Sequence, residues 1–298
     1  MSRSWLVTGA HGQLGTALCA HLATASVEVE GVDLEVDIAD RDAIRAKLAT
    51  RRWDGVLNAA AFTQVDRCER ELEAAARGNA EGPAVLAHAC RDAGIALVHV
   101  STDYVFDGHG TRPYREDDPT EPRSAYGRTK LAGEHAVLAA SPSSLVVRTS
   151  WVFGRGRNFL AAILDQAAKR RSGEASGPLR VVDDQRGRPT YAVDLAAGIW
   201  GLVEVGAVGL YHVANEGVAT WWELARFCLD EAGCHDLLID KISSGELRVD
   251  APRPAWSVLD TSKARAAGVA LRPWQDAVRA YLRSDASPLR GAPWEGKV

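Results

Sequence analysis

A glycine-rich turn near the start of the chain most restricts its fold. Residues 5–8 (Trp-Leu-Val-Thr) have the character of a short buried strand, and residues 14–23 have the apolar spacing of a helix. The turn between them reads Gly9-Ala10-His11-Gly12-Gln13-Leu14-Gly15. Glycines at this spacing permit a tight turn and let the backbone approach a pyrophosphate at the N-terminus of the helix. The turn therefore predicts a dinucleotide-binding βαβ unit, although a strand-to-helix turn without a ligand can also be rich in glycine.

Short apolar runs alternate with helix patterns as far as Arg148. The runs that predict strands are residues 27–33, 56–58, 95–101 and 145–148, and those that predict helices are residues 40–50, 71–93 and 126–140. Strands that alternate with helices form a parallel sheet with helices on both faces. We therefore expect an α/β fold with a doubly wound parallel sheet of the Rossmann type.

This alternation breaks after Arg148, where Gly, Arg and Pro punctuate residues 154–190. We expect a dinucleotide-binding Rossmann domain over residues 1–148 and a smaller α/β domain, mainly for the substrate, over residues 149–298. Segments near 190–208 and 253–262 are expected to return to the first domain.

Composition limits the partners and the compartment. Of the 298 residues, 46% are apolar and 25% are charged, and the formal charge of −4 gives no reason to expect nucleic acid or an anionic membrane surface as a partner. The chain reaches Gly9 too early to hold the apolar core of a signal peptide, and it contains no run of about 18 apolar residues to span a bilayer. The five cysteines form no CxxC pair, which favours reduced thiols in the cytoplasm. The eight histidines show no HxH or HxxxH spacing, so no metal site is expected.

Two further strand ends suit a dinucleotide. Asp33 ends the second predicted strand and is placed to accept a hydrogen bond from a ribose hydroxyl, while Asp37 could reach an adenine amine; either could instead cap a helix. The third predicted strand ends in Asn58-Ala59-Ala60-Ala61-Phe62-Thr63. Small side chains there let a cofactor lie across the carboxyl edge of the sheet, or let a helix pack closely against the strand.

The chemistry is carried by a tyrosine and a lysine on one predicted helix. Tyr126 and Lys130 are four residues apart, so both lie on the same helix face, and Thr102 lies at the polar end of the preceding strand. A phenol is a weak acid at neutral pH, and a nearby ammonium favours its phenolate and so makes its proton easier to give. Reduction of a carbonyl by hydride needs such a proton donor for the oxygen.

Seven motifs resemble those of one family. They are GxxGQLG at 9–15, NAAAFTxVD at 58–66, STDYVFDG at 101–108, YGRTKLAGE at 126–134, RTSWVFG at 148–154, DDQRGRPT at 183–190, and the stretch from Tyr211-His212 to Trp222-Glu223. Together they resemble the dTDP-4-dehydrorhamnose reductases, which are extended short-chain dehydrogenases. The resemblance implies reduction by NADPH or NADH of the C4 keto group of dTDP-4-dehydro-L-rhamnose (dTDP-6-deoxy-L-lyxo-4-hexulose) to give dTDP-L-rhamnose. It implies a catalytic set of Thr102, Tyr126 and Lys130.

The resemblance also implies binding residues. Cofactor contacts are expected at Gly9, Gly12, Gln13, Leu14, Gly15, Asp33, Asp37, Ile38, Ala61, Phe62, Thr63, Tyr126 and Lys130. Contacts with the nucleotide sugar are expected at Val65, Thr102, Asp103, Tyr104, Tyr126, Trp151, Asn158 and Arg253. Trp151 offers an aromatic plane to a pyrimidine, unless its indole fills the core. Arg253, between Pro252 and Pro254, could bind diphosphate through its planar fork, unless it is a solvated surface arginine.

One departure from the family and three rival functions remain. Some members hold a divalent ion between subunits through acids that include one on the first helix, but residues 16–24 contain no Asp or Glu. No metal is therefore expected, and at most a weak homodimer. The rivals are a 4-ketoreductase for another nucleotide-activated deoxysugar in a secondary-metabolite pathway, an epimerase or dehydratase, and a regulatory subunit without turnover. The intact set of Thr102, Tyr126 and Lys130 argues against the last.

Overall fold

A six-stranded parallel sheet forms the centre of the first lobe. The computed structural model describes residues 3–289. The strand order is β2-β1-β3-β4-β5-β10, with neighbours parallel throughout. The strands are β1 (Ser4–Thr8), β2 (Glu28–Val32), β3 (Gly55–Asn58), β4 (Ala96–Thr102), β5 (Leu145–Thr149) and β10 (Gly209–His212). The predicted doubly wound parallel sheet is confirmed, and β10 is a strand that the sequence patterns did not indicate.

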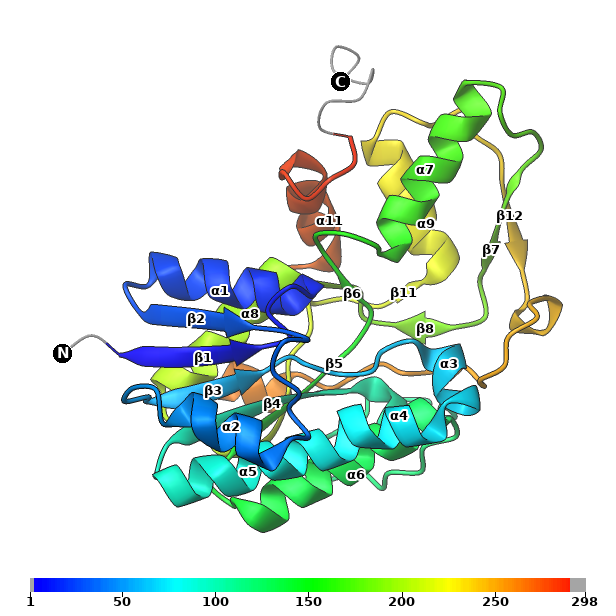
Figure 1. The fold of residues 1–298 in the computed structure, drawn as a ribbon. Helices are drawn as coiled ribbons and strands as arrows, with labels where there is room; N and C mark the ends of the chain where they lie inside the picture. Colours follow the sequence, from blue (N-terminus) through cyan, green and yellow to red (C-terminus); the bar gives the residue numbers. More distant parts are fainter. Residues whose placement is uncertain (1–2, 290–298) are drawn as a thin grey trace.

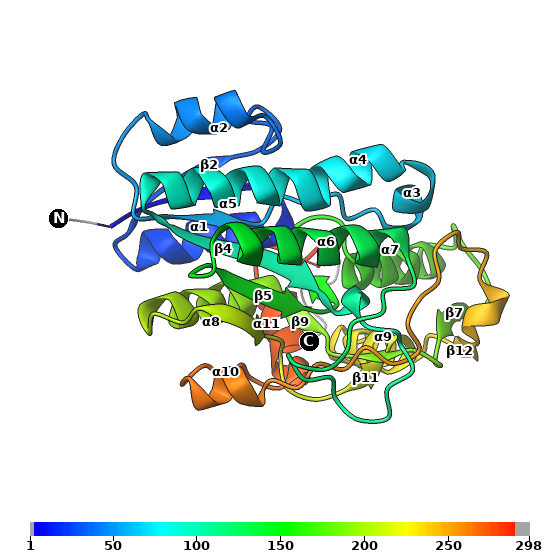
Figure 2. The same ribbon diagram turned by 90° about the horizontal axis from the view of Figure 1, so that it is seen from below.

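Helices cover both faces of this sheet (Figures 1 and 2). One face carries α1 (Gln13–Thr24) and α8 (Ala192–Glu204), and the other carries α2 (Arg41–Leu48), α5 (Gly82–Ala93) and α6 (Ala125–Ala140). Side-chain caps start two of them: Asp40 accepts from two backbone N–H groups of α2, and Ser124 accepts from the Gly127 N–H of α6. The caps explain why the periodic patterns begin where they do.

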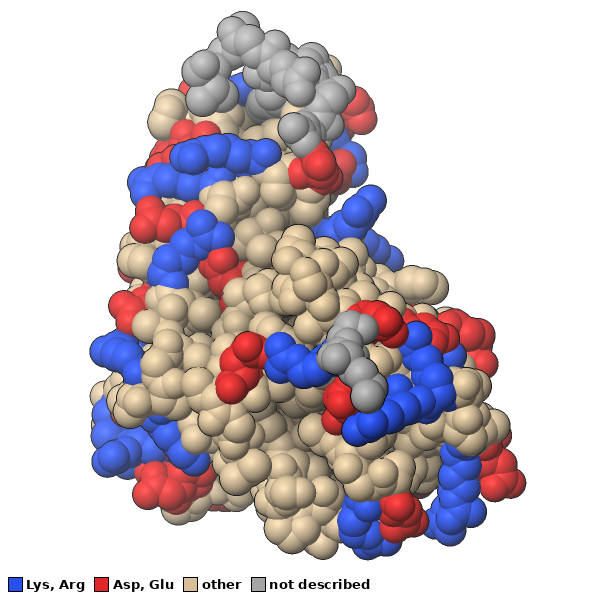
Figure 3. All heavy atoms as spheres, turned by 90° about the vertical axis from the view of Figure 1, so that its left-hand side faces the viewer, with Lys and Arg blue, Asp and Glu red and all other residues tan. Residues whose placement is uncertain are grey.

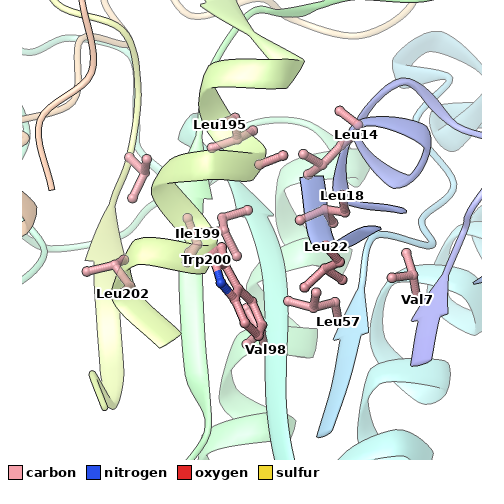
Figure 4. Packing of buried hydrophobic residues seen from close by; sticks show 14 of the residues in the cluster. Val7, Leu14, Leu18, Leu22, Leu57, Val98, Leu195, Ile199, Trp200 and Leu202 are labelled. Carbon is pink, nitrogen blue, oxygen red and sulfur yellow. The ribbon is translucent and has the colours of Figure 1, made fainter. Parts of the chain in front are cut away.

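The core between α1, α8 and the sheet follows from helical spacing. Leu14, Leu18 and Leu22 recur every four residues on α1, and they point toward Leu195 and Ile199 of α8 (Figure 4). Leu22 and Ile199 are both fully buried. This packing fixes the start of α1 against the carboxyl end of β1.

One predicted helix contains an interruption. The sequence predicts a single helix over residues 71–93, whereas the chain forms α4 (Leu72–Ala76), a π-helical turn (Arg77–Glu81) and then α5. Pro83 has no N–H to donate to the carbonyl of Asn79, so the regular ladder cannot continue there. The side-chain amide of Asn79 makes contacts of its own: its Oδ1 accepts from the Phe62 N–H at 2.8 Å, and its Nδ2 donates to Thr129 Oγ1 at 3.1 Å. The wider turn thereby joins the loop after β3 to α6.

The second lobe has its own core of small sheets and helices (Figure 1). Its paired strands are β6 (Val152–Phe153) with β9 (Thr190–Tyr191), β7 (Leu179–Val182) with β12 (Ile239–Ile242), and β8 (Arg186–Gly187) with β11 (Ala219–Thr220). The helices of the second lobe are α7 (Phe159–Arg171), α9 (Trp221–Glu231) and α11 (Trp274–Arg283).

The short helices that remain are distributed over the molecule. They are α3 (Val65–Arg70), α10 (Ser262–Ala266) and the 3₁₀ turns Asp103–Val105 and Ser244–Glu246.

The chain returns to the first lobe after leaving it. Helix α8 packs against α1, β10 extends the central sheet beside β5, and Trp256 and Leu259 form isolated bridges with His109 and Tyr114. We propose the two lobes as the two domains. The last residues of the expected second domain, 290–298, lie outside the described part of the chain.

Basic and acidic side chains are interspersed on the face shown in Figure 3. Within residues 3–289, no helix is long and apolar enough to cross a membrane.

Leu22 provides a test of the core. Replacing this fully buried side chain by Ala should lower the free energy of unfolding by about 2–5 kcal/mol, because a cavity remains under α8. Leu72, which is 55% exposed, is a matched control. Leu72→Ala should change the free energy of unfolding by less than about 0.5 kcal/mol. Urea unfolding of both variants measures this. Equal losses would contradict the described packing of α1.

Candidate active site

A cavity of about 550 Å³ opens at the carboxyl ends of the central strands. Of the residues predicted for the site, it brings together Gly9, Gly12, Gln13, Leu14, Gly15, Asp33, Ala61, Thr63, Val65, Thr102, Asp103, Tyr104, Tyr126, Lys130 and Trp151. The lining also includes Ala59 and Ala60 of the predicted run of small residues. Residues that were not predicted complete it, namely Leu34, Val100, Ser101, Thr149, Ser150, Val152 and Trp221. Most of these are neighbours of predicted residues at the strand ends, where the topology of a parallel sheet leads them.

The glycine-rich turn forms one end of the cavity by close backbone contacts. Gly9 has a φ of 69°, and a Cβ there would lie 2.6 Å from the backbone N of Ala60. A Cβ on Gly15 would lie 2.0 Å from the Gly9 carbonyl oxygen. The N-cap of α1 is Gly12, which has no side chain to cap the helix. The turn thus leaves room and a positive helix end for an anionic group.

Asp33 marks the far end of the same surface. Its carboxylate accepts a hydrogen bond from the His11 N–H at 2.8 Å, and its own N–H donates to Glu35 at 2.8 Å. The neighbouring Leu34 is 95% exposed at the edge of the cavity. The carboxylate of Asp33 is therefore held in place where the sequence predicts a ribose hydroxyl.

Lys130 is buried beneath the cavity. Only 2% of it is exposed, and its Nζ donates to the Val100 carbonyl at 2.6 Å. Burial lowers the pKa of Lys130 to about 8, although the nearby carboxylate of Glu134 acts in the opposite direction. Most of this lysine is therefore charged at pH 7.

Tyr126 keeps its proton at neutral pH. The sequence predicts that Lys130 lowers the pKa of this phenol, whereas burial raises the pKa well above its ordinary value and a hydrogen bond with Thr102 opposes the rise. The loss of hydration of the phenolate therefore raises the pKa more than the hydrogen bond with Thr102 lowers it. A protonated phenol is the form that can donate a proton.

Thr102 and Asp103 form a buried polar pair beside Tyr126. The Thr102 hydroxyl donates to Asp103 Oδ1 at 3.0 Å. Burial raises the pKa of Asp103 to about 7, while hydrogen bonds with Ser257 and Thr102 lower it. Next to them, the rings of Tyr104 and Tyr126 meet edge to face, with centroids 5.5 Å apart. The phenols and the carboxyl thus meet at the floor of the cavity.

Several polar atoms of the lining lack partners within the described residues. They are Gln13 Oε1, Ser101 Oγ, Asp103 Oδ2 and Thr149 Oγ1, all buried. A buried polar atom without a hydrogen bond costs free energy, and a polar ligand in the cavity would satisfy it. The lining therefore fits a polar molecule such as a dinucleotide, with the glycine-rich turn for its phosphates.

Trp151 lines the cavity but is not free on both faces. It has a positive φ of 46°, which is strained for a large residue, and its ring stacks on Trp221 with centroids 3.6 Å apart and planes 5° apart. A base can therefore use at most the other face of Trp151 while this stack persists. Trp221 was not predicted, although the pair of adjacent tryptophans Trp221 and Trp222 at the start of a helix was a visible signal.

Three residues predicted to contact the cofactor lie outside the lining. Asp37 pairs with Arg77 at 2.5 Å on the surface, which lowers the pKa of its carboxyl. Ile38 is buried in the core, where Gly82 leaves space for it. Phe62 is held through its backbone by Asn79.

Two residues predicted to contact the sugar nucleotide also lie outside the lining. Asn158 caps α7 by accepting from the Ala161 N–H, and its amide N donates to the Gly154 carbonyl at 2.6 Å. Arg253 lines a second cavity of about 300 Å³, which shares Tyr104 and Trp221 with the first. Arg253 therefore lines a neighbouring cavity and Asn158 caps a helix, and the contacts of both with the sugar nucleotide stay predictions.

All five cysteines are free, and four of them are buried. Within residues 3–289, no three His, Cys, Asp or Glu side chains gather closely enough to hold a metal ion.

Comparison with known proteins identifies the family. The family model described as RmlD substrate binding domain matches residues 3–287. The chain belongs to this family. A relative named dTDP-4-dehydrorhamnose reductase, from Streptomyces griseus, is 42% identical, with 92% of this chain and 91% of the relative covered. A relative from Streptomyces antibioticus, named probable dTDP-4,6-dihydroxy-2-methyloxan-3-one 4-ketoreductase, is also 42% identical, with 92% and 93% covered.

A solved structure gives the same result in three dimensions. The dTDP-4-dehydrorhamnose reductase of Bacillus anthracis in complex with NADP has a TM-score of 0.88 and 30% identity to this chain, with 95% of this chain and 99% of that chain covered. The predicted family is thereby confirmed, and the RmlD-type fold extends over both lobes.

The charge of Lys130 should set the alkaline limit of this RmlD family member. Because the ammonium is present below its pKa of about 8 and lost above it, kcat/KM should fall as the pH rises through about 8. A pH–rate profile from 6 to 9.5 measures this. Lys130→Arg keeps its charge, so its profile should lose that limb even where its rate is lower. A flat wild-type profile would show that Lys130 does not govern the rate.

Proposed function

We propose that the protein is an NAD(P)H-dependent reductase of dTDP-4-dehydro-L-rhamnose that produces dTDP-L-rhamnose in the cytoplasm, as a monomer or weak homodimer. One observation carries the proposal: Thr102, Tyr126 and Lys130 share a single cavity with the glycine-rich turn. The cavity thus combines a proton donor for a carbonyl oxygen with a site for a dinucleotide. The names and coverage of the relatives support the same reaction.

The residues divide the reaction among them. A reduced nicotinamide, when bound, supplies the hydride for the carbonyl carbon of the sugar. The Tyr126 hydroxyl gives its proton to the carbonyl oxygen. The Thr102 hydroxyl, which donates to Asp103 Oδ1 in the structure, would turn its one proton to that carbonyl oxygen. The Lys130 ammonium, charged at neutral pH, favours the phenolate that remains on Tyr126.

The second cavity suits the nucleotide half of the substrate. It meets the first cavity at Tyr104 and Trp221, and its walls include apolar side chains such as Ile163 and Val181 together with Arg253. Apolar walls fit a pyrimidine, and the guanidinium of Arg253 fits a diphosphate. We assign the sugar to the first cavity and the base to the second.

A second candidate differs only in the sugar. The relative from Streptomyces antibioticus, whose name gives another 4-keto sugar, is as similar to this chain as the reductase from Streptomyces griseus. Comparing kcat/KM for the two 4-keto sugar nucleotides distinguishes these candidates. Net oxidation of NADPH in the same assays distinguishes both from an epimerase or a regulatory subunit.

Tyr126→Phe tests the proposed acid. The variant keeps the ring and Lys130 but lacks the proton donor, so kcat should fall by about 10²–10⁴-fold, which is roughly 3–5 kcal/mol of barrier. The Kd for NADPH should change little. Steady-state kinetics with dTDP-4-dehydro-L-rhamnose measure the rate, and fluorescence titration measures NADPH binding.

Lys130→Met is the companion to this variant. It should reduce both the rate and the affinity for NADPH, because we assign its ammonium to the phenol and to the nicotinamide ribose. A folded Tyr126→Phe protein that retains more than about a tenth of the wild-type kcat would refute the assignment of the acid. Asp103 would then be the next candidate, since its carboxyl is protonated below about pH 7.

Asp33 should set the choice between the two cofactors. Its fixed carboxylate, with Glu35 beside it, would repel the 2′-phosphate of NADPH, so we expect NADH to be preferred. Asp33→Asn should raise the ratio of kcat/KM for NADPH to that for NADH by about tenfold, or about 1.4 kcal/mol. The charge change Asp42→Asn, on α2 and outside the cavity, serves as the control. An unchanged ratio in Asp33→Asn would contradict the assignment.

A further inference from the structure

Asp66 joins α3 of the first lobe to the segment that carries Arg253. Its Oδ2 accepts from Arg253 at 2.7 Å, and its Oδ1 accepts from the backbone N–H groups of Asp250 and Ala251, both at 3.1 Å. Burial raises the pKa of Asp66, but the hydrogen bonds from Arg253 and Ala251 more than offset this, so its pKa is lower than usual. Asp66 is therefore an ionised carboxylate that binds three donors of one short segment.

Arg253 is held firmly but not completely used. Besides Asp66, its guanidinium donates to the Ala251 carbonyl at 2.8 Å, and the side chain is 20% exposed. A guanidinium has five N–H donors, so these two contacts leave others for a ligand. The flanking Pro252 and Pro254 restrict the backbone, and Pro254 lies so close to Gly108 that a Cβ on that glycine would be 2.7 Å away.

The pair lies at the junction of the two cavities. Val65, the residue before Asp66, lines the first cavity, and Arg253 lines the second. The charges of both Arg253 and Asp66 reach the Tyr104 hydroxyl, with opposite effects on its pKa. Tyr104 belongs to both cavities. A ligand that extends from the sugar site into the second cavity therefore passes beside Arg253.

We propose that Asp66 is a positioning residue, which aims the guanidinium of Arg253 at the diphosphate of the sugar nucleotide. This inference rests on the proposed function, because it requires a nucleoside diphosphate sugar as the substrate. An unrestrained arginine side chain loses rotamer freedom when it binds a phosphate. Asp66 bears that cost in advance and also ties α3 to the second lobe. Two effects compete, since the carboxylate also repels the diphosphate, and the contacts with three donors indicate that positioning is the larger.

Binding of dTDP and thymidine tests the proposal. In calorimetry, Asp66→Ala should raise the Kd for dTDP by about tenfold and change that for thymidine by less than about twofold, because only dTDP carries the diphosphate. A purely structural function would weaken both ligands equally. In kinetics, KM for the sugar nucleotide should rise while kcat at saturation and the Kd for NADPH stay the same.

Four further variants decide the outcome. Arg253→Gln should raise the Kd for dTDP. The double variant with Asp66→Ala should have nearly the same Kd as Arg253→Gln, because Asp66 acts through Arg253. Asp66→Asn, the milder change, covers the case in which the alanine variant does not fold. Asp250→Asn is the matched control: it removes the exposed pair of Arg70 with Asp250, at 3.2 Å, from the same segment and should leave dTDP binding unchanged.

The results separate the inference from the function on which it rests. Two results would overturn the positioning function of Asp66 and leave the proposed function intact. They are tighter binding of dTDP by folded Asp66 variants, and effects of Asp66→Ala and Arg253→Gln on the free energy of dTDP binding that add fully. A wild-type protein that binds neither dTDP nor the sugar nucleotide would overturn the proposed function, and the inference with it.

Discussion

The site depends on backbone meeting backbone at the carboxyl edge of the sheet. Gly9 with its φ of 69°, and Gly15 at the first turn of α1, permit contacts that any Cβ would prevent. Because the turn is so tight, α1 starts directly on the sheet, and its leucines enter the core under α8. The same contact puts the helix N-terminus, the alanines after β3 and the polar end of β4 around one cavity. A Cβ added at Gly9 or Gly15 would therefore disturb both the core and the site.

Buried charge below the cavity forms a second layer. Lys130 lies one helical turn before Glu134, and Glu134 accepts a bidentate pair of hydrogen bonds from Arg148 on β5, at 2.9 and 2.7 Å. Both partners of this ion pair are nearly fully buried. Removing one partner of such a pair is costly, whereas replacing both by apolar residues is often neutral. Its position beside Lys130 connects the charge of the lysine to the packing of α6 on the sheet.

Periodicity was enough to predict the alternation of strands and helices as far as Arg148, because β1, β3 and β5 are fully buried and the helices have one apolar face. Strand β10 was missed since its residues, Gly209–His212, gain strand character only by pairing with β5. The cavity residues at strand ends followed from motifs, whereas Trp221 and Asp66 gain their importance from contacts with distant residues. Asp37 and Asn158 lie outside the lining of the cavity, where Asp37 pairs with Arg77 and Asn158 caps α7, and their contacts with ligands stay predictions.

The two lobes are joined where the substrate is proposed to bind. The return of α8 and β10 to the central sheet means that neither lobe folds from one continuous half of the chain. Tyr104 follows β4 of the first lobe and Trp221 starts α9 of the second, yet both line the two cavities. A ligand that spans the cavities therefore contacts both lobes at once. The binding free energy of such a ligand therefore depends on how firmly the two lobes are held together. Under this proposal, the contact of Asp66 with the segment 250–253 contributes to substrate recognition as well as to folding.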